Sequence, residues 1–249
     1  MDRNRIKAED ETLDTFYHGR IKVLQKSRGY RFAVNAPLLA DFIRTDKNAE
    51  LLELGTGNGI ISLLLSVKPF KHITAVEIQP SLAHLARRNV QLNRLENRID
   101  VIEADLLTFQ PGKKYDVIFS NPPYHRRGKG HLSRSEEISI AKHELKCTIF
   151  DIMQKTSSLL KREGRAYFVF PEKRREDLLK AAGLNGLYIK LKRFVCPRAG
   201  EKPSLFLIAC DFVSEEMLVL PDLILYDKEG RYTSEAKEIF AGRLHAPTS

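Results

Sequence analysis

The 249-residue chain has few cysteines and no long hydrophobic segment. Cys147, Cys196 and Cys210 are scattered without C-x-x-C spacing, so we expect three buried thiols in a reducing cytoplasm, neither a disulfide framework nor a zinc site. The longest apolar run, IISLLLSV from Ile60, is far shorter than the roughly 20 residues that span a bilayer. The charged N-terminus predicts that there is no signal peptide. The histidines form no H-x-x-x-H pair or Cys/His cluster, so no metal site is expected.

The positive charge is concentrated in one part of the chain. The net charge is +9, and the segment from Asn121 to Gly200 holds 18 Lys and Arg against 8 Asp and Glu. A basic excess confined to one segment favours the docking of an anionic partner there, with nucleic acid the first interpretation. Solvated helix faces and an acidic protein partner are the alternatives, because charge alone does not distinguish them.

Apolar strands alternate with helices from residue 49 onward. Strands are expected at 49–55, 71–78, 98–105, 115–120 and 164–171, and helices at 59–68, 81–93, 149–161 and 174–183. This alternation predicts an α/β fold, Rossmann-like and doubly wound, with helices on both faces of a mostly parallel sheet. Two further strands, at 187–196 and 203–213, are expected to form a terminal antiparallel pair and to bring the sheet to seven strands.

The expected organisation is one domain over residues 1–249. Residues 1–48 form an N-terminal lead-in, loosely ordered over 1–20, with a short strand and a helix that opens near Pro37. Residues 49–213 form the catalytic core, and residues 214–249 form a C-terminal appendage. Gly183 is expected to cap the helix at 174–183.

Three glycines stand where the first core strand turns into its helix. In ELGTGNG they are Gly55, Gly57 and Gly59, and they permit a tight turn and a close approach of a ligand to the backbone. The spacing is G-x-G-x-G, because Ile60 occupies the position where a dinucleotide enzyme has its third glycine. The motif therefore argues against a nicotinamide dehydrogenase and favours a nucleotide cofactor without a pyrophosphate.

Acidic residues end the next two strands. Glu77 lies 22 residues beyond Gly55, where a carboxylate can accept hydrogen bonds from ribose hydroxyls. Asp105 is expected to accept a hydrogen bond from an adenine amino group, and Leu106 to add a backbone donor and an apolar wall. Each feature alone also fits a turn, a helix N-terminal charge or a cap. Together at one edge of the sheet they predict a nucleoside pocket.

The fourth core strand ends in SNPPY. The Asn121 side-chain oxygen and the Pro122 carbonyl can accept the two hydrogens of a conjugated amine and so free the lone pair of its nitrogen. Pro122 and Pro123 fix φ and remove competing donors, and Tyr124 offers a face for stacking a planar substrate. The pattern predicts methylation of an exocyclic amine in which positioning replaces a strong base. The alternative is an Asn-Pro turn with a partly buried tyrosine.

Four motifs, ELGTGNG, AVEIQP, EADLL and SNPPY, together resemble those of class I S-adenosylmethionine-dependent methyltransferases of the amino-methylating, NPPY-bearing kind. RGYRFAVNAPLLADF, KHELKC and YTSEAKEIF more narrowly resemble the tRNA1(Val) (adenine-37-N6)-methyltransferase family, over about residues 20–240. The resemblance implies a class I methyltransferase fold, S-adenosylmethionine as cofactor, and methyl transfer to the N6 amino group of an adenine in tRNA.

The resemblance also implies residue roles. Cofactor contacts are expected at Glu53, Gly55, Gly57, Gly59, Glu77, Ile78, Asp105, Leu106 and Asn121. The catalytic residues are expected to be Asn121, Pro122, Pro123 and Tyr124, and the substrate contacts Tyr124, Arg126, Arg127 and Lys129. Phe32 and Asn35 are expected to close over the cofactor, although Asn35 stands where an acidic residue is expected.

Other functions compete with this interpretation. Protein glutamine N5-methyltransferases share NPPY but usually carry a helical domain ahead of the glycine loop, and only 52 residues precede Glu53. Ribosomal RNA guanine-N2 enzymes often carry an extra domain, and DNA adenine enzymes generally need a target-recognition domain. A non-catalytic RNA-binding module would need neither Asn121 nor the strand-end acids. The nucleotide modified, the choice between tRNA and ribosomal RNA, and the oligomeric state are left open.

Overall fold

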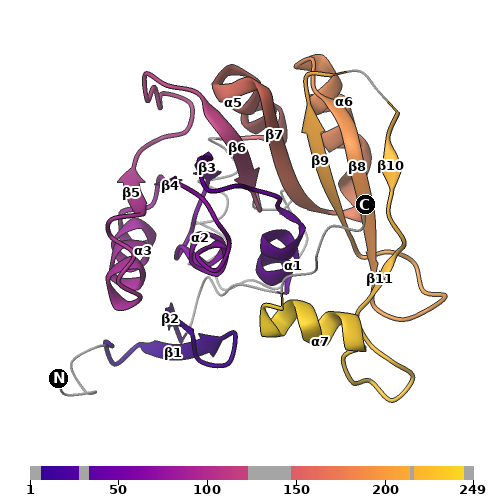
Figure 1. Ribbon diagram of the computed structural model, residues 1–249, viewed down its shortest axis with the longest axis horizontal. Helices are drawn as coiled ribbons and strands as arrows, with labels where there is room; N and C mark the ends of the chain where they lie inside the picture. The colour runs from indigo at the N-terminus through magenta and orange to yellow at the C-terminus, as the bar shows by residue number, and fades with distance from the viewer. Residues whose placement is uncertain (1–6, 28–33, 123–146, 214–215, 244–249) are drawn as a thin grey trace, which may run out of the picture.

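A computed structural model describes residues 7–27, 34–122, 147–213 and 216–243 (Figure 1). Seven strands form the body of its central sheet: β3 (Glu50–Leu54), β4 (His72–Glu77), β5 (Ile99–Glu103), β6 (Tyr115–Ser120), β7 (Leu160–Pro171), β8 (Tyr188–Cys196) and β9 (Leu205–Asp211). Two short strands, β10 (Leu218–Val219) and β11 (Leu223–Ile224), pair with β8 and extend the sheet to nine. These two strands were not predicted, because a strand of two residues shows no periodicity in the sequence.

The sheet is mostly parallel, as expected. Its order is β10-β8-β9-β7-β6-β3-β4-β5, and β3 to β7 are parallel to their neighbours within this set. Strand β9 is antiparallel to both β7 and β8. The expected antiparallel pair is therefore present, but its second strand lies inside the sheet, and β8 points in the same direction as the parallel strands.

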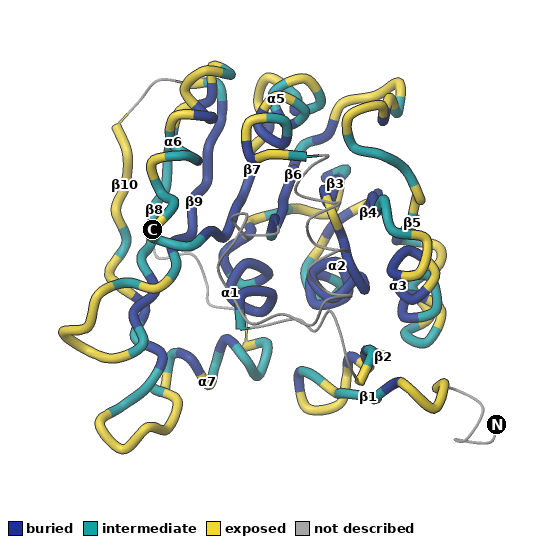
Figure 2. The backbone as a smooth tube through the Cα atoms, turned by 180° about the vertical axis from the view of Figure 1, so that it is seen from behind, coloured by how far each residue is buried: buried dark blue, intermediate teal, exposed yellow. Residues whose placement is uncertain are grey.

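Helices cover both faces of the sheet. The helices are α1 (Asn35–Phe42), α2 (Ile60–Leu65), α3 (Pro80–Leu92), α5 (Ile149–Leu159), α6 (Arg175–Leu184) and α7 (Ser234–Ala241), with a 3-10 turn at Glu172–Arg174. Consecutive residues of β7 enter opposite cores: Tyr167 and Val169 pack on the side of α1 and α2, and Phe168 and Phe170 on the side of α5 and α6. Because both faces are covered, the central strands are buried along their length (Figure 2) and are apolar without alternation.

The N-terminal segment is more ordered than expected. β1 (Glu11–Phe16) and β2 (Ile21–Lys26) form an antiparallel hairpin, so the expectation of a loose lead-in over residues 1–20 is wrong for this part. Asn89 of α3 holds the hairpin in place: it accepts a hydrogen bond from the Leu24 N–H at 2.7 Å and donates one to the Leu24 carbonyl at 3.0 Å. These contacts join residues 65 positions apart and leave no local sequence signal.

The helix expected at 174–183 is present, but Gly183 does not cap it. α6 includes Gly183, and the left-handed glycine that follows the helix is Gly186, with φ +68°. Within the described residues, no helix is long and apolar enough to cross a membrane. The assignment of residues 1–249 to one domain stays a prediction.

Candidate functional site

The strand order reverses between β3 and β6. From β3 the chain proceeds through β4 to β5 on one side, and then through β6 to β7 on the other. Ligands of open α/β sheets bind at the carboxyl ends of the strands where such a reversal occurs. The glycine loop follows β3 and Asn121 follows β6, so the fold brings the two predicted motifs to the same point.

The glycine loop has a backbone that requires glycine. Gly55, Gly57 and Gly59 have φ of +76°, +59° and +86°, which side chains with a Cβ adopt at a cost. A Cβ on Gly59 would lie 3.4 Å from the Ala86 Cβ, so α3 packs closely on the start of α2. A Cβ on Gly55 would meet no atom within 4 Å, so that side of the loop leaves room for a ligand.

Glu53 is the penultimate residue of β3, just before the glycine loop, and is 1% exposed. Its Oε2 accepts hydrogen bonds from the Thr56 and Ser62 hydroxyls, at 2.6 and 2.5 Å. Its Oε1 is buried and accepts no hydrogen bond within the described structure. Burial raises the pKa of Glu53 to about 7. A buried acceptor without a donor costs about 1–3 kcal/mol, so Oε1 suits a donor group on a bound ligand.

Glu77 ends β4 and is also buried. Its Oε2 accepts from the Gly57 N–H at 2.8 Å and its Oε1 from the Gln79 N–H at 2.9 Å. Burial raises the pKa of this carboxyl. The two backbone donors fix its orientation, and each oxygen retains a lone pair for a further donor such as a ribose hydroxyl. Ile78 follows it and is half-buried.

Asp105 lies in the turn after β5. The Ala104 N–H donates to the Glu77 carbonyl at 2.9 Å, which keeps this turn beside the end of β4. Asp105 Oδ1 accepts from the Leu107 N–H at 2.9 Å, and Asp105 and Leu106 are both half-buried. The three predicted elements of the nucleoside pocket therefore occupy adjacent strand ends.

Asn121 is half-buried at the end of β6, and Pro122 after it is buried. The Asn35 amide donates to Asn121 Oδ1 at 3.5 Å, across 86 residues of sequence. Asn35 therefore contacts the residue that is expected to hold the target amine, and its expected closure over the cofactor stays a prediction. The remaining predicted site residues, Phe32, Pro123, Tyr124, Arg126, Arg127 and Lys129, lie outside the described residues.

The structure adds one residue to the site. Asn58, between the last two glycines of the loop, is 1% exposed, and neither atom of its side-chain amide has a hydrogen-bond partner in the described structure. Its carbonyl accepts from Asn89 at 2.9 Å. Asn58 was not among the predicted site residues, although an amide inside a glycine turn is visible in the sequence.

These features fit S-adenosylmethionine. The glycine loop leaves one side open for a ligand. A nucleoside that carries an amino acid chain would find polar partners in the unpaired Oε1 of Glu53, the unpaired side-chain amide of Asn58 and the oriented carboxylate of Glu77. No group of three or more His, Cys, Asp or Glu able to hold a metal ion occurs among residues 7–27, 34–122, 147–213 and 216–243.

Solved structures resemble this fold. A predicted O-methyltransferase from Agrobacterium tumefaciens superposes with a TM-score of 0.67 at 19% identity, covering 85% of this chain and 98% of that one. The tRNA m1G37 methyltransferase of M. jannaschii gives a TM-score of 0.56 at 15% identity, covering 82% and 55%. At these identities the likeness concerns the fold alone, and it confirms the expected class I methyltransferase fold.

Known sequences identify the family. Residues 31–179 match the family model described as methyltransferase small domain. The tRNA1(Val) (adenine(37)-N6)-methyltransferase of Glaesserella parasuis is 32% identical over 200 residues, which cover 80% of this chain and 83% of the relative. Its namesake in Bacteroides thetaiotaomicron is 31% identical, covering 76% and 79%. The chain therefore belongs to the methyltransferase small domain family and, within it, to the tRNA1(Val) (adenine(37)-N6)-methyltransferases, which use S-adenosylmethionine.

Proposed function

We propose that this protein methylates the N6 amino group of adenine 37 in a valine tRNA, in the cytoplasm. The observation that carries the proposal is the position of Asn121, at the end of β6 and at the strand reversal beside the glycine loop. Relatives that align over most of this chain are named for the same reaction. One domain spanning residues 1–249 is part of this proposal.

The residues at the ends of β3, β4 and β5 hold the cofactor. The backbone of the loop from Gly55 to Gly59 passes close to it, Glu77 accepts from the ribose hydroxyls, and Asp105 with Leu106 contacts the adenine. Glu53 accepts from a donor group through its unpaired Oε1. When bound, the cofactor supplies an electrophilic methyl group on a sulfonium.

Asn121 and Pro122 prepare the nucleophile. An adenine amino group is a weak nucleophile because its lone pair is conjugated with the ring. Asn121 Oδ1 accepts one of its hydrogens and the Pro122 carbonyl accepts the other, so the lone pair turns toward the methyl group. Asn35 donates to the same Oδ1 at 3.5 Å and restricts the rotation of the Asn121 amide. Stacking on Tyr124 and phosphate contacts at Arg126, Arg127 and Lys129 complete the proposal.

The test of the reaction is mass spectrometry of digested tRNA. In a strain that lacks this protein, we expect valine tRNA to lose N6-methyladenosine, and the purified protein with S-adenosylmethionine to restore it. Methylation of a glutamine-containing peptide in place of RNA would support the protein N5-methyltransferase alternative. Methylation of ribosomal RNA alone would support the ribosomal alternative.

The test of the mechanism is Asn121→Ala. We expect kcat to fall at least about a hundredfold while the cofactor Kd stays within a few-fold, because Asn121 contacts the reacting amine and holds it for transfer. Asn48→Ala is the matched control, since Asn48 is exposed, lies just before β3 at the opposite end of that strand from the glycine loop, and should leave kcat unchanged. Full activity of Asn121→Ala contradicts the mechanism.

The test of the basic segment is the salt dependence of tRNA binding. Arg126→Ala combined with Arg127→Ala should reduce the slope of log K against log salt by about one to two, because each phosphate contact contributes about 0.7–0.9. Cofactor affinity should not change. An unaltered slope would show that Arg126 and Arg127 do not contact the phosphates of the tRNA.

A further inference from the structure

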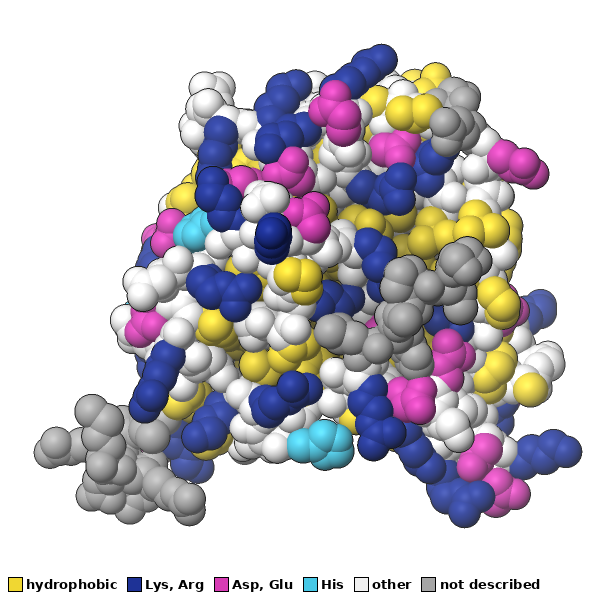
Figure 3. Space-filling view, viewed as in Figure 1, with side chains coloured by type: hydrophobic (Ala, Val, Ile, Leu, Met, Phe, Trp, Pro, Cys, Tyr) yellow, Lys and Arg dark blue, Asp and Glu magenta, His cyan; other side chains and the backbone are white. Residues whose placement is uncertain are grey.

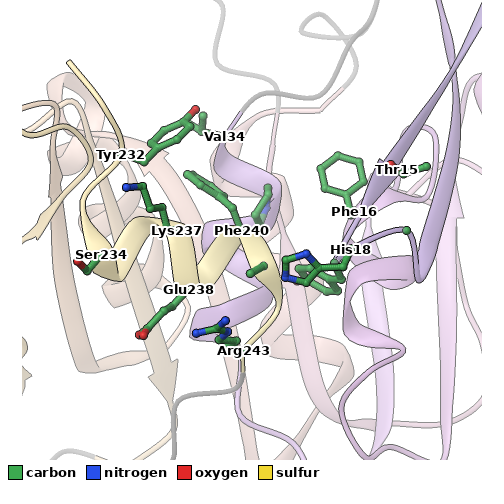
Figure 4. A pocket seen from close by; sticks show the side chains of 14 residues that line it. Thr15, Phe16, His18, Val34, Tyr232, Ser234, Lys237, Glu238, Phe240 and Arg243 are labelled. Atoms are coloured by element: carbon green, nitrogen blue, oxygen red, sulfur yellow. The ribbon is translucent and has the colours of Figure 1, made fainter. Parts of the chain in front are cut away.

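A groove lies outside the residues assigned above, between the β1–β2 hairpin, the start of α1 and α7 (Figure 4). Its volume is about 1010 Å³. Among its lining residues are Phe16, His18, Val34, Tyr232, Phe240 and Arg243. These residues come from the N-terminal lead-in and the C-terminal appendage, which the catalytic core, residues 49–213, separates in the sequence.

Aromatic rings form part of the wall. Tyr232 is 36% exposed, its ring meets the Phe240 ring edge-on at 4.7 Å between centroids, and the Tyr226 ring stacks on it at 5.0 Å. In Figure 4, Phe16 of the hairpin lies across the groove from Phe240 of α7. Unpaired nucleobases bind proteins mainly by stacking on such rings, which contribute about 1–3 kcal/mol per base.

The end of the groove at the hairpin turn has a constrained backbone. Tyr17 and His18 have φ of +53° and +57°, a conformation that costs non-glycine residues about 1 kcal/mol each. The Tyr17 ring packs directly on Gly242, where a Cβ would lie 2.4 Å from Tyr17 Cγ. This contact joins the hairpin to the end of α7 and keeps His18 and Arg243 at the same end of the groove (Figure 4).

The charge at the groove favours an anionic partner. Lys237 and Arg243 line it, and Glu238 is the single acidic residue among the described residues that do so. Other Lys and Arg side chains recur along the lower edge of the molecule, where the hairpin and α7 lie, and Asp and Glu side chains stand among them (Figure 3). Rings combined with permanent cations match an RNA strand, with bases on the rings and phosphates at the cations.

The groove and the catalytic site are linked through the start of α1. Val34 lines it and directly precedes Asn35, whose amide contacts Asn121. We propose that the groove binds the unpaired nucleotides that adjoin the target adenine, with a base stacked on Tyr232 and Phe240. This inference rests on the proposed function, because it requires an RNA substrate whose target base lies at Asn121.

The first test reverses the charge of the groove. Lys237→Glu combined with Arg243→Glu should weaken tRNA binding at least tenfold, while the cofactor Kd stays within twofold of the wild type. Lys228→Glu is the matched control, since Lys228 is an exposed lysine of the same appendage that does not line the groove. It should change tRNA affinity by less than twofold. Equal tRNA affinity in the groove variant and the control overturns the inference.

The second test does not depend on binding energy. A benzophenone amino acid in place of Tyr232 should crosslink, on irradiation, to nucleotides next to the methylated adenine. Crosslinks confined to a second copy of the chain, to its own terminus or to distant parts of the tRNA overturn the inference. If the wild type methylates tRNA but the groove neither crosslinks nor affects affinity, the proposed function stands without the groove. A wild type that neither binds nor methylates tRNA contradicts both.

Discussion

Glu53 provides a direct test of the site because its carboxyl is buried and its pKa is raised to about 7. The perturbation is Glu53→Gln. Between pH 4.5 and 7 the folded protein retains a proton that the unfolded chain has released, so the free energy of unfolding of the wild type falls as pH rises through this interval. At 1.36 kcal/mol for each pKa unit, the fall is on the order of 3 kcal/mol and is complete above pH 7.

The assay is urea unfolding without cofactor at pH 5, 6, 7 and 8. Glutamine does not titrate, so the free energy of unfolding of Glu53→Gln should lack this decline. Glu50→Gln is the control on the same strand. Hydrogen bonds and ion pairs with Lys113 and Lys71 lower the pKa of Glu50 to about 2. The contribution of Glu50 to the free energy of unfolding is therefore lost only as pH falls below 4.5 toward 2. Glu50→Gln should therefore leave the decline of the free energy of unfolding between pH 5 and 7 the same as in the wild type. An identical decline in the wild type and in Glu53→Gln refutes the reasoning.

The same residue links pH to cofactor affinity. If Oε1 accepts from a donor of the cofactor, the charged form that prevails above pH 7 binds more tightly than the protonated form. Calorimetry should show the affinity of the wild type for S-adenosylmethionine rising between pH 6 and 8, and Glu53→Gln should bind about 10–100-fold more weakly, the loss expected for a charge-assisted hydrogen bond of about 1.5–3 kcal/mol. If Glu53→Gln binds S-adenosylmethionine as tightly as the wild type, Glu53 does not contact the cofactor.

Three further predictions concern packing and positioning. Gly242→Ala should lower the free energy of unfolding by about 2–4 kcal/mol and Gly230→Ala by only about 1 kcal/mol, since both glycines have positive φ but only Gly242 packs on a ring. Equal losses in urea unfolding would contradict the contact of Gly242 with the Tyr17 ring. Burial lowers the pKa of Lys68 to about 8, so stability should rise between pH 8 and 10.5 in the wild type and stay flat in Lys68→Met. Asn35→Ala should lower kcat about tenfold without changing cofactor affinity, and a change in KM alone would contradict its contact with Asn121.

The sequence by itself determined the elements and the motifs. The apolar runs of β3, β4 and β6 predicted strands close to their observed bounds, because a strand buried on both faces is apolar whatever its neighbours are. The three glycines of ELGTGNG predicted a tight turn that the structure contains, because a left-handed backbone is a local requirement. The SNPPY motif directly after a strand predicted Asn121 as a site residue, and the structure places it after β6.

Only the tertiary structure decided what these elements meet. The order of the strands, and with it the meeting of the glycine loop and Asn121, depends on crossovers that no local pattern records. The sequence predicted the short strand β2 but not its pairing with β1, because the hairpin is held by Asn89, 65 residues away from Leu24. The raised pKa of Glu53 and the contact of Tyr17 with Gly242 likewise require segments that are distant in sequence. The burial of a residue depends on the segments that pack against it. The periodicity of apolar residues shows which face of a helix or strand is buried, but it does not show which segment covers that face.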